Sequence, residues 1–493
     1  MKIIDKFLNS IGMYRLVIYG LSFISFVLIL FGFLNIIPYR GFDLIISLIF
    51  IMTVCEVLNQ IVARIVGAYR GTDSTYITSL ILFLILSPFE KLPDFLPIFI
   101  ACFVAIMSKY ILAYHKKHIF NPAAFAAFFV SITSIWPATW WSSNSSSILF
   151  LIIVGLLIVK KIKRFSLFLT FFVISYIMIL FFYLNSGAEL TQAIGDILLS
   201  WPIVFLGTIM LTEPSTTPPT VKYQVLYGAI VAVFMGIQFR FGRLHSTPQL
   251  ALLIGNLFSY YVSPKIKVIL ELDQIKNIGK NIYEFVFDVK ERFGFLPGQY
   301  MEWTLLHNHE DSRGNRRYFT IASSPTESKI YLGVKIPEKP SSFKKRLLDL
   351  KKGDKMSVSQ LSGEFLIESN QNIPLVFIAG GIGITPFRSM VSYIIDKKQN
   401  RDVIVFYACS DDAEFVYKDV FKNAEKYGVK TYFINTKKDG FIDENLIKNK
   451  VSNYINRIYY LSGPNAMVDN YKKVIKNLGV KSKNIRSDYF PGY

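Results

Sequence analysis

The stretch RRYFTIASS in the second half of the chain combines three residue types that suit a phosphorylated heterocyclic ligand. Arg317 offers a guanidinium for a pyrophosphate, Phe319 an aromatic ring that can lie against a flat ring system, and Thr320 a hydroxyl that can hydrogen-bond to it. Strand alternation puts Arg317 and Phe319 on one face and Thr320 on the other, so a local kink is needed for all three to meet one ligand. Taken alone, the spacing R-x-F-T is also common in strands that bind no ligand.

A second stretch, FIAGGIGITPF, runs an apolar strand into a glycine-rich turn. Gly380, Gly381 and Gly383 would let backbone amides approach a pyrophosphate, and Thr385 and Pro386 open a helix whose N-terminus favours negative charge. Alone, such a glycine-rich turn only suggests a dinucleotide site.

Two further strand ends extend the expected site. YYLSGPNAM places Gly463 and Pro464 at the end of a later strand, so this strand, like the first, runs into a glycine-containing turn. Another strand is followed by Asp411 and Asp412, and an acid there favours a ribose 2′-hydroxyl and repels a 2′-phosphate. This pattern favours NADH over NADPH, with solvated loop residues as the alternative interpretation.

The elements that must position these residues change character along the second half of the chain. From Lys267 onward, KVILELDQI, NIYEFVFDV, GQYMEWTL, RRYFTIASS, KIYLGVKI and KMSVSQL read as short strands, which predicts an antiparallel β-barrel. After about residue 372, strands alternate with helices, which predicts a parallel sheet with crossover helices. We place the two domains at 264–370 and 371–493.

The first half of the chain is apolar in runs of about 15 to 25 residues, the length that crosses a hydrocarbon core of roughly 30 Å. These runs predict a polytopic α-helical membrane domain over 1–263 with about ten spans, although several runs are short and eight is the alternative. The candidate spans are 14–37, 43–69, 74–88, 93–114, 121–136, 147–160, 165–185, 195–212, 222–240 and 246–263.

The formal net charge of +19 is divided between the halves: residues 1–263 hold 17 Lys and Arg against 9 Asp and Glu, and the remainder holds 37 against 26. No nucleic-acid-binding motif occurs, so a nucleic-acid partner is not expected. The basic residues of the first half gather in alternate loops, which fits the positive-inside rule with the N-terminus in the cytoplasm. We therefore expect a multi-pass protein of the cell (inner) membrane whose first apolar run is a retained helix and whose C-terminal half is cytoplasmic.

The order of motifs in the second half resembles the ferredoxin–NADP reductase family, from GQY through R-x-F-T, Gly363–Phe365, GGIGITP and SGP-x-x-M to an acidic–aromatic C-terminus. The resemblance covers 264–493 almost end to end, although the family often has Cys where Ser462 stands. It implies FAD as cofactor and NAD(P)H as substrate. The residues it assigns to the two nucleotides are Arg317, Tyr318, Phe319, Thr320, Ser341, Ser342, Gly380, Gly381, Gly383, Thr385, Gly463, Pro464 and Phe490. It assigns Thr320, Ser462 and Asp488 to the catalytic centre.

Three polar stretches interrupt the apolar half: HIFNPAAF, GTIMLTEPSTTPPT and GRLHSTPQLALLIGN. Acids at membrane depth are costly and usually face a cavity, whereas the alternative is a capped helix end. In this order the stretches resemble the flavin-carrying membrane subunit of Rnf complexes and of sodium-pumping NADH:quinone reductase, over roughly 40–263. The resemblance implies electron transfer within an ion-translocating assembly, and an electron-acceptor site at Asn121, Thr212, Glu213 and Thr216.

One departure from this family concerns its covalent flavin. The S-G-A-T attachment loop is replaced here by WPATWWSSNSSS, so a covalent flavin is not expected, whereas noncovalent FMN or riboflavin, or a quinone, is.

Other redox groups are not expected. The three cysteines, Cys55, Cys102 and Cys409, have no spacing typical of a disulfide framework, a metal site or an iron–sulfur cluster. Haem in a membrane bundle needs paired histidines within spans, and the histidines of the first half lie at predicted span ends.

The sequence therefore predicts a membrane-bound FAD-dependent NAD(P)H oxidoreductase that passes electrons to a membrane flavin or quinone, with ion translocation and other subunits of an Rnf-like assembly as further expectations. Lipid and a quinone or another electron acceptor are the expected partners. The alternative is a membrane-anchored or transporter-linked redox-sensing flavin reductase without vectorial electron transfer.

Overall fold

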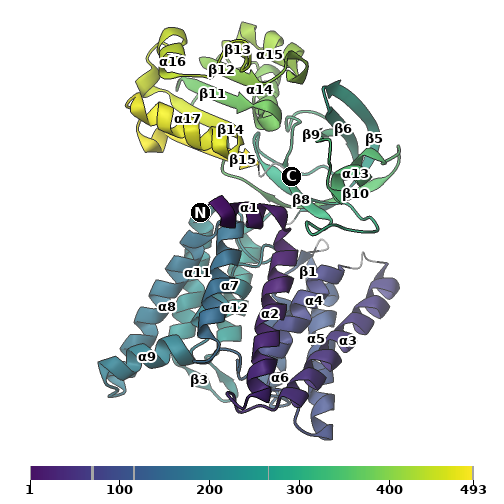
Figure 1. Ribbon diagram of the computed structural model, residues 1–493, viewed down its shortest axis with the longest axis vertical. Helices are drawn as coiled ribbons and strands as arrows, with labels where there is room; N and C mark the ends of the chain where they lie inside the picture. The colour runs from purple at the N-terminus through teal and green to yellow at the C-terminus, as the bar shows by residue number, and fades with distance from the viewer. Residues whose placement is uncertain (1, 68–70, 115–116, 265, 491–493) are drawn as a thin grey trace. The chain divides into compact units, whose positions relative to one another are not determined.

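The computed structural model describes residues 2–67, 71–114, 117–264 and 266–490 (Figure 1). The chain divides into two compact units, Met1–Lys265 and Ile266–Tyr493, which we call the helical unit and the nucleotide unit.

The helical unit contains little besides helices. They are α1 (Lys2–Ser10), α2 (Met13–Phe33), α3 (Gly41–Val66), α4 (Thr72–Ile85), η1 (Leu92–Asp94), α5 (Phe95–Ile111), α6 (Pro122–Ile132), α7 (Ile148–Ile162), α8 (Phe165–Asn185), α9 (Leu190–Ser200), α10 (Ile203–Phe205), the π-helix η2 (Leu206–Met210), α11 (Val221–Gly236) and α12 (Pro248–Val262). Two short hairpins, β1–β2 (Ala113–Tyr114 and Lys117–His118) and β3–β4 (Arg240–Phe241 and Leu244–His245), join neighbouring helices.

The prediction of about ten spans was wrong. Over the described residues, four helices are long and apolar enough to cross a membrane: Met13–Phe33, Gly41–Val66, Leu92–Ile111 and Phe165–Asn185. A fifth span is counted only if Leu190–Ser200 and Ile203–Met210, bent by 49°, act as one. Helix length explains the difference, because α4, α6 and α11 have 14, 11 and 16 residues. At 1.5 Å per residue they reach only about 17–24 Å, against a hydrocarbon core of roughly 30 Å.

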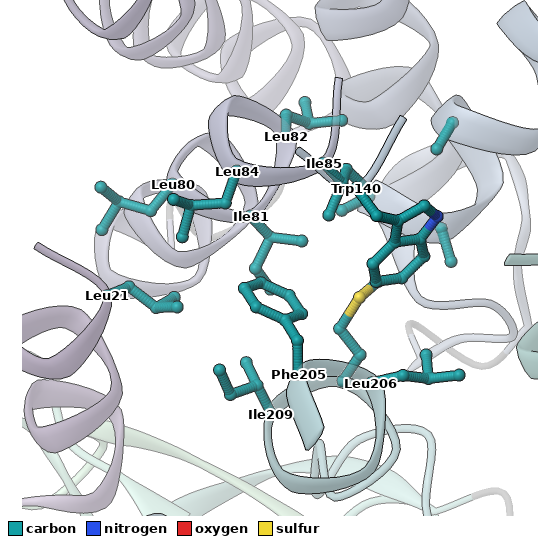
Figure 2. Close-up of a cluster of buried hydrophobic side chains, with 14 of the residues drawn as sticks. Leu21, Leu80, Ile81, Leu82, Leu84, Ile85, Trp140, Phe205, Leu206 and Ile209 are labelled. Atoms are coloured by element: carbon teal, nitrogen blue, oxygen red, sulfur yellow. The ribbon is translucent and has the colours of Figure 1, made fainter. Parts of the chain in front are cut away.

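Short helix α4 forms the centre of the helical unit. Its last six residues, Leu80 to Ile85, are all at most 3% exposed, as expected of a helix that is apolar on every side. Figure 2 shows Ile81 directed toward Phe205, with Trp140, Leu206 and Ile209 around them.

The C-terminal end of α4 is bound by a later loop. The backbone N–H of Trp140 donates to the carbonyl of Ile85 (2.9 Å), that of Ser142 to Leu84 (3.3 Å), and the Trp141 indole to Phe83 (2.7 Å). These bonds satisfy carbonyls that a helix end leaves without an intrahelical donor.

The outer helices show the opposite pattern. Large apolar side chains point outward from α2, α3 and α8, with Phe26 65%, Phe42 70% and Phe181 65% exposed. Such an extensive apolar exterior is unusual on a soluble protein and marks a surface that contacts lipid or another protein.

The nucleotide unit begins with an antiparallel sheet. Its strands are β5 (Lys267–Gly279), β6 (Ile282–Val289), β7 (Tyr300–Thr304), β8 (Arg316–Thr320), β9 (Ile330–Lys335) and β10 (Lys355–Ser362), in the order β8-β7-β10-β5-β6-β9. Helix α13 (Ser342–Leu348) lies between β9 and β10 in the chain. Beyond the end of β8, the N–H of Ala322 donates to the carbonyl of Tyr331 on β9 (2.9 Å), which draws the two edge strands together. The predicted β-rich domain is confirmed; we call it the first lobe.

The second lobe is the predicted parallel α/β sheet. Strands β11 (Leu375–Gly380), β12 (Val403–Cys409), β13 (Val429–Asn435), β14 (Ile458–Pro464) and β15 (Ile485–Phe490) lie in the order β13-β12-β11-β14-β15. Their crossovers contain η3 (Gly381–Ile384), α14 (Thr385–Asp396), α15 (Lys418–Asn423), α16 (Glu444–Lys450) and α17 (Asn465–Asn477). Strand β15 was not predicted, because the acidic–aromatic C-terminus was expected only as a binding segment.

Candidate functional site

Arg317 and Phe319 lie on one face of β8, as strand alternation predicts. Arg317 is 5% exposed, and its Nη1 donates to the carbonyls of Arg313 (2.7 Å), Gly314 (3.0 Å) and Arg316 (2.7 Å). The Phe343 ring of α13 joins the two residues, since its centroid is 5.1 Å from the Arg317 guanidinium and 6.0 Å from the Phe319 ring.

Tyr318 and Thr320, also on this strand, differ in their exposure and in their hydrogen bonds. Tyr318 is 40% exposed and its hydroxyl donates to Glu302 (3.1 Å). Thr320 is only 3% exposed, and its hydroxyl has no hydrogen-bond partner among the residues that the structure describes. A buried hydroxyl without a partner is costly, so Thr320 is suited to a ligand that supplies one.

The start of α13 brings positive charge to the same place. Ser341 caps this helix by accepting from the Lys344 N–H (3.3 Å), and Ser342 contacts His307 Nε2 (2.9 Å). Lys344 is buried and donates to the carbonyl of Lys335 (2.9 Å). Burial, with the neighbouring charges of Arg317 and Arg313, lowers the pKa of Lys344 to about 8. Asp311 lies 2.8 Å from Arg313 and 3.8 Å from Arg317 and offsets one of these charges. The remaining excess of positive charge would gain from a bound anion.

The two glycine-containing turns of the second lobe lie against each other. Strands β11 and β14 are adjacent, with Ala379 paired to Ser462. A Cβ on Gly383 would lie 2.4 Å from the Ser462 carbonyl oxygen, and a Cβ on Gly380 would lie 2.2 Å from the Met467 sulfur. Gly381 has φ +54°, which favours glycine. The turns can therefore pack this closely only without side chains.

The remaining predicted residues surround these turns. Thr385 begins α14, and its hydroxyl donates to the carbonyl of Ile382 (3.1 Å). The Ser462 hydroxyl is fully buried, with no hydrogen-bond partner in the described parts of the chain, and Ser462 pairs in register with Asp488 on β15. Gly463 and Pro464 end β14. The side chain of Phe490 lies outside the described residues.

The acids behind the preference for NADH are both ion-paired. Asp411 contacts Lys280 (2.7 Å), and Asp412 contacts Lys438 (2.5 Å) and Asn435 (2.8 Å). Their side chains are 35% and 54% exposed, so both are solvated loop residues in surface ion pairs, and the preference for NADH stays a prediction.

In the helical unit, Asn121 connects the three polar stretches. It caps α6 by accepting from the Ala124 N–H (2.9 Å), and its Nδ2 donates to Glu213 (2.8 Å). Its backbone N–H donates to Asn256 (2.9 Å), which in turn donates to the Tyr227 hydroxyl (3.0 Å).

Glu213 accepts further bonds from its own loop, from Ser215 (2.7 Å) and Thr216 (3.2 Å). His118 Nε2 lies 3.0 Å from the Ser215 hydroxyl and 3.5 Å from a Glu213 oxygen. Asn121, Glu213 and Thr216 are thus brought together, whereas the Thr212 hydroxyl instead donates to the carbonyl of Thr208 (2.6 Å). His118 and Tyr227 were not predicted as members of this cluster; the position of His118, three residues before Asn121, was the available signal.

A pocket adjoins this cluster within the helical unit. Its polar lining residues include Asn121, Thr212 and Glu213, together with Ser74 and Thr78. The rest is apolar and comes mainly from α2, α4, α7 and η2, through Met13, Val17, Ile77, Ile81, Ile158, Ile162 and Ile209.

Comparisons with known proteins bear on the nucleotide unit. Residues 377–473 match the family described as oxidoreductase NAD-binding domain. The chain is 26% identical to a flavohemoprotein of Bacillus cereus over 215 residues, 40% of this chain and 53% of that protein. It is 25% identical to flavohemoprotein A of Dictyostelium discoideum over 232 residues, 43% of this chain and 57% of that protein. It therefore spans about half the length of these curated relatives. A crystal structure of flavohemoglobin from Malassezia yamatoensis with bound FAD and heme aligns at 17% identity and a TM-score of 0.42, over 67% of this chain and 98% of that one.

These comparisons correct the exclusion of haem. That exclusion was part of the cofactor expectation, which also named noncovalent FMN or riboflavin and no iron–sulfur cluster. The matching relatives are flavohemoproteins. The exclusion rested on the absence of paired histidines within supposed spans, and most of those spans do not exist as long helices. The positions of those histidines therefore cannot decide the cofactor content.

The chain contains an FNR-like NAD- and FAD-binding oxidoreductase domain. The side chains present fit FAD: a cation cluster suits a diphosphate, and the Thr320 hydroxyl is buried without a partner in the described protein. In the paired glycine turns, a Cβ would meet a neighbouring atom closely at Gly380, Gly383 and Gly463, whereas one on Gly381 would meet nothing within 4 Å.

Proposed function

We propose that the chain is an FAD-dependent NAD(P)H oxidoreductase that is held in the cell membrane by its helical unit and passes electrons from FAD to a quinone in the pocket beside Glu213. The observation that carries the proposal is the composition of that pocket, a largely apolar cavity with hydrogen-bonding groups in its lining. This composition suits a lipid-soluble carrier with a polar headgroup.

In the nucleotide unit, we assign Arg317 and Lys344 to the FAD diphosphate and the Thr320 hydroxyl to the flavin ring. The turns at Gly381 and Gly463 would receive NAD(P)H, next to Ser462 and Asp488. Bound FAD would accept a hydride and release electrons one at a time. We retain 264–370 and 371–493 as the proposed domain boundaries.

The test compares two activities of the purified full chain. Glu213→Gln and Asn121→Leu should reduce NADH-driven quinone reduction at least tenfold, because they remove the proposed headgroup contacts, each worth about 1.5 kcal/mol or more for a charged partner. Reduction of ferricyanide, which draws electrons directly from FAD, should be nearly unchanged.

Glu56→Gln is the matched control. Glu56 lies on α3 and accepts from Gln60 (3.1 Å), and it does not line the pocket. Equal loss of both activities in the Glu213 and Asn121 variants would make these residues structural. Intact ferricyanide reduction with no quinone reduction by the wild-type chain would favour the alternative, a redox-sensing reductase without vectorial electron transfer.

For the membrane orientation, we propose that the pocket end of the helical unit faces the cytoplasm. Arg64, Lys160, Lys161 and Arg164 lie at helix ends on this side, and Asn256, in the second half of α12, contacts Asn121 there. The chain therefore leaves the helical unit at the same end. A reporter fused after residue 263 should be cytoplasmic and one inserted within 143–147 should be external; the same location for both would overturn the orientation.

Membership of an Rnf-like assembly and coupling to ion translocation are the most remote parts of the proposal, because they rest on the resemblance of the three polar stretches. Affinity purification from membranes should recover further subunits, and quinone reduction should respond to an imposed ion gradient. Extraction of the purified chain should give FAD, and a pyridine haemochrome spectrum would show whether haem accompanies it.

A further inference from the structure

Arg388 belongs to the second lobe, but its guanidinium forms an ion pair with a residue of the first lobe. It lies in the first turn of α14, three residues after Thr385, and is 7% exposed. Its Nη2 donates to Glu327 Oε1 (2.9 Å) and its Nη1 to Glu327 Oε2, so the pair is bidentate. Nη1 also donates to the carbonyl of Ala322 (3.1 Å). A guanidinium is the side chain whose planar shape fits two carboxylate oxygens at once.

Neighbouring groups strengthen the same connection. The hydroxyl of Ser389 is fully buried and donates to the carbonyl of Ser323 (2.7 Å). Glu327 is itself fixed, because it accepts from the N–H of Ser324 (2.6 Å). The Arg388 guanidinium lies 4.7 Å from the ring centroid of Tyr331 on β9. The first turn of α14 is therefore fastened to residues 322–327 by several independent contacts.

The fastened segments are those that lead directly from the two candidate nucleotide sites. Residues 322–327 begin two residues after Thr320, and α14 begins directly after the glycine turn Gly381–Ile384. Few rotatable bonds separate the contact from either site. A change in the contact is therefore transmitted to the spacing between β8 and the turn.

We propose that Arg388 and Glu327 form a positioning pair that sets the separation between the flavin-binding strand and the nicotinamide-binding turn; this role rests on the assignment of the two nucleotides under the proposed function. Hydride transfer needs the reacting atoms about 3–3.5 Å apart, and a misplacement of about 1 Å can cost roughly 100-fold in rate. Neither Arg388 nor Glu327 is assigned to the ligands, so both act through the strand and the turn.

The experiment uses the full chain with ferricyanide as electron acceptor and NADH deuterated at the transferred position. Arg388→Met should keep FAD but lower kcat by about 10- to 100-fold. The primary isotope effect on kcat should rise, because hydride transfer becomes the slow step. Arg388→Lys and Glu327→Gln, which perturb folding less, should show the same change to a smaller degree, since neither restores a bidentate pair of full charge.

Arg457→Met is the matched control. Arg457 is 2% exposed and makes a bidentate pair with Asp402 (2.8 and 2.6 Å), and its other contacts, Ser452 and Leu375, also lie in the second lobe. Its loss should lower the melting temperature without changing the isotope effect.

A purely structural Arg388 would behave like Arg457, with an unchanged isotope effect in all three variants, and that result would overturn the proposal. A wild-type chain that does not reduce ferricyanide with NADH would instead overturn the proposed function. If Arg388→Met does not fold, Arg388→Lys and Glu327→Gln decide the question by the same isotope effect.

Discussion

Replacing Thr320 by Val should make the FAD-free protein more stable and its FAD binding weaker. Valine keeps the shape of threonine and exchanges the hydroxyl for a methyl group. The hydroxyl is 3% exposed and without a hydrogen-bond partner in the described chain. Leaving such a group unsatisfied costs about 1–3 kcal/mol, so its removal should raise the free energy of unfolding by that amount. For a unit of this size, the melting temperature should rise by roughly 2–4 °C per kcal/mol.

The FAD-bound protein should not share this gain, because under the proposed assignment the flavin ring gives the hydroxyl a partner. By linkage, FAD affinity should therefore fall by at least the same free energy, about 5- to 150-fold in Kd. Thermal melts of the full chain with and without FAD measure the stability, and fluorescence titration measures the affinity.

Thr431→Val is the matched control for this prediction. Its hydroxyl, on β13, is also buried and lacks a hydrogen-bond partner within the described residues. The substitution should stabilise the protein and leave FAD affinity unchanged. A lower melting temperature for FAD-free Thr320→Val, or an unchanged FAD affinity, would refute the reasoning.

Three more predictions concern the same unit. Arg317→Ala should raise the Kd for FAD by about 10- to 150-fold in a fluorescence titration, because a charge-assisted contact worth about 1.5–3 kcal/mol is lost; unchanged affinity would remove Arg317 from the diphosphate site. Gly383→Ala should raise the KM for NADH at least about tenfold at unchanged FAD content, because its Cβ would lie 2.4 Å from the Ser462 carbonyl oxygen and the turn must move. Lys344 has a pKa of about 8, below its unfolded value, so the folded protein binds fewer protons and stability should rise from pH 8 to about 10.4. FAD affinity should fall over the same rise in pH, as Lys344 loses its charge, and Lys344→Met should abolish both dependences.

The second half of the chain was largely predictable because local patterns decide it. Alternating strands and the strand–glycine–helix sequence at Gly380–Thr385 identify the two lobes, and the tight approach of Gly383 to Ser462 explains why glycine is needed there. The link between Arg388 and Glu327 was not predictable, because it joins residues 61 positions apart that carry no motif.

The first half was predictable in its contacts but not in its spans. The polar residues of three separate stretches do meet at Asn121, Glu213 and Asn256, since polar groups among apolar helices must find each other. The predicted span lengths were wrong because an apolar run can continue past the point where a helix ends. For example, α6 ends at Ile132, and Ser134 takes φ +59° within the same apolar run. An apolar run predicts burial in either lipid or protein, and only packing distinguishes the two.

The short central helix α4 has a consequence for how the protein is made. The carbonyls of Phe83, Leu84 and Ile85 receive their donors from Trp140, Trp141 and Ser142, residues synthesised more than 50 positions later. In hydrocarbon, each carbonyl without a donor costs several kcal/mol. Under the membrane location proposed for the helical unit, a nascent chain that ends before residue 140 has no stable place for α4 in the bilayer. Insertion of this helix should follow, and not precede, synthesis of the loop that closes it.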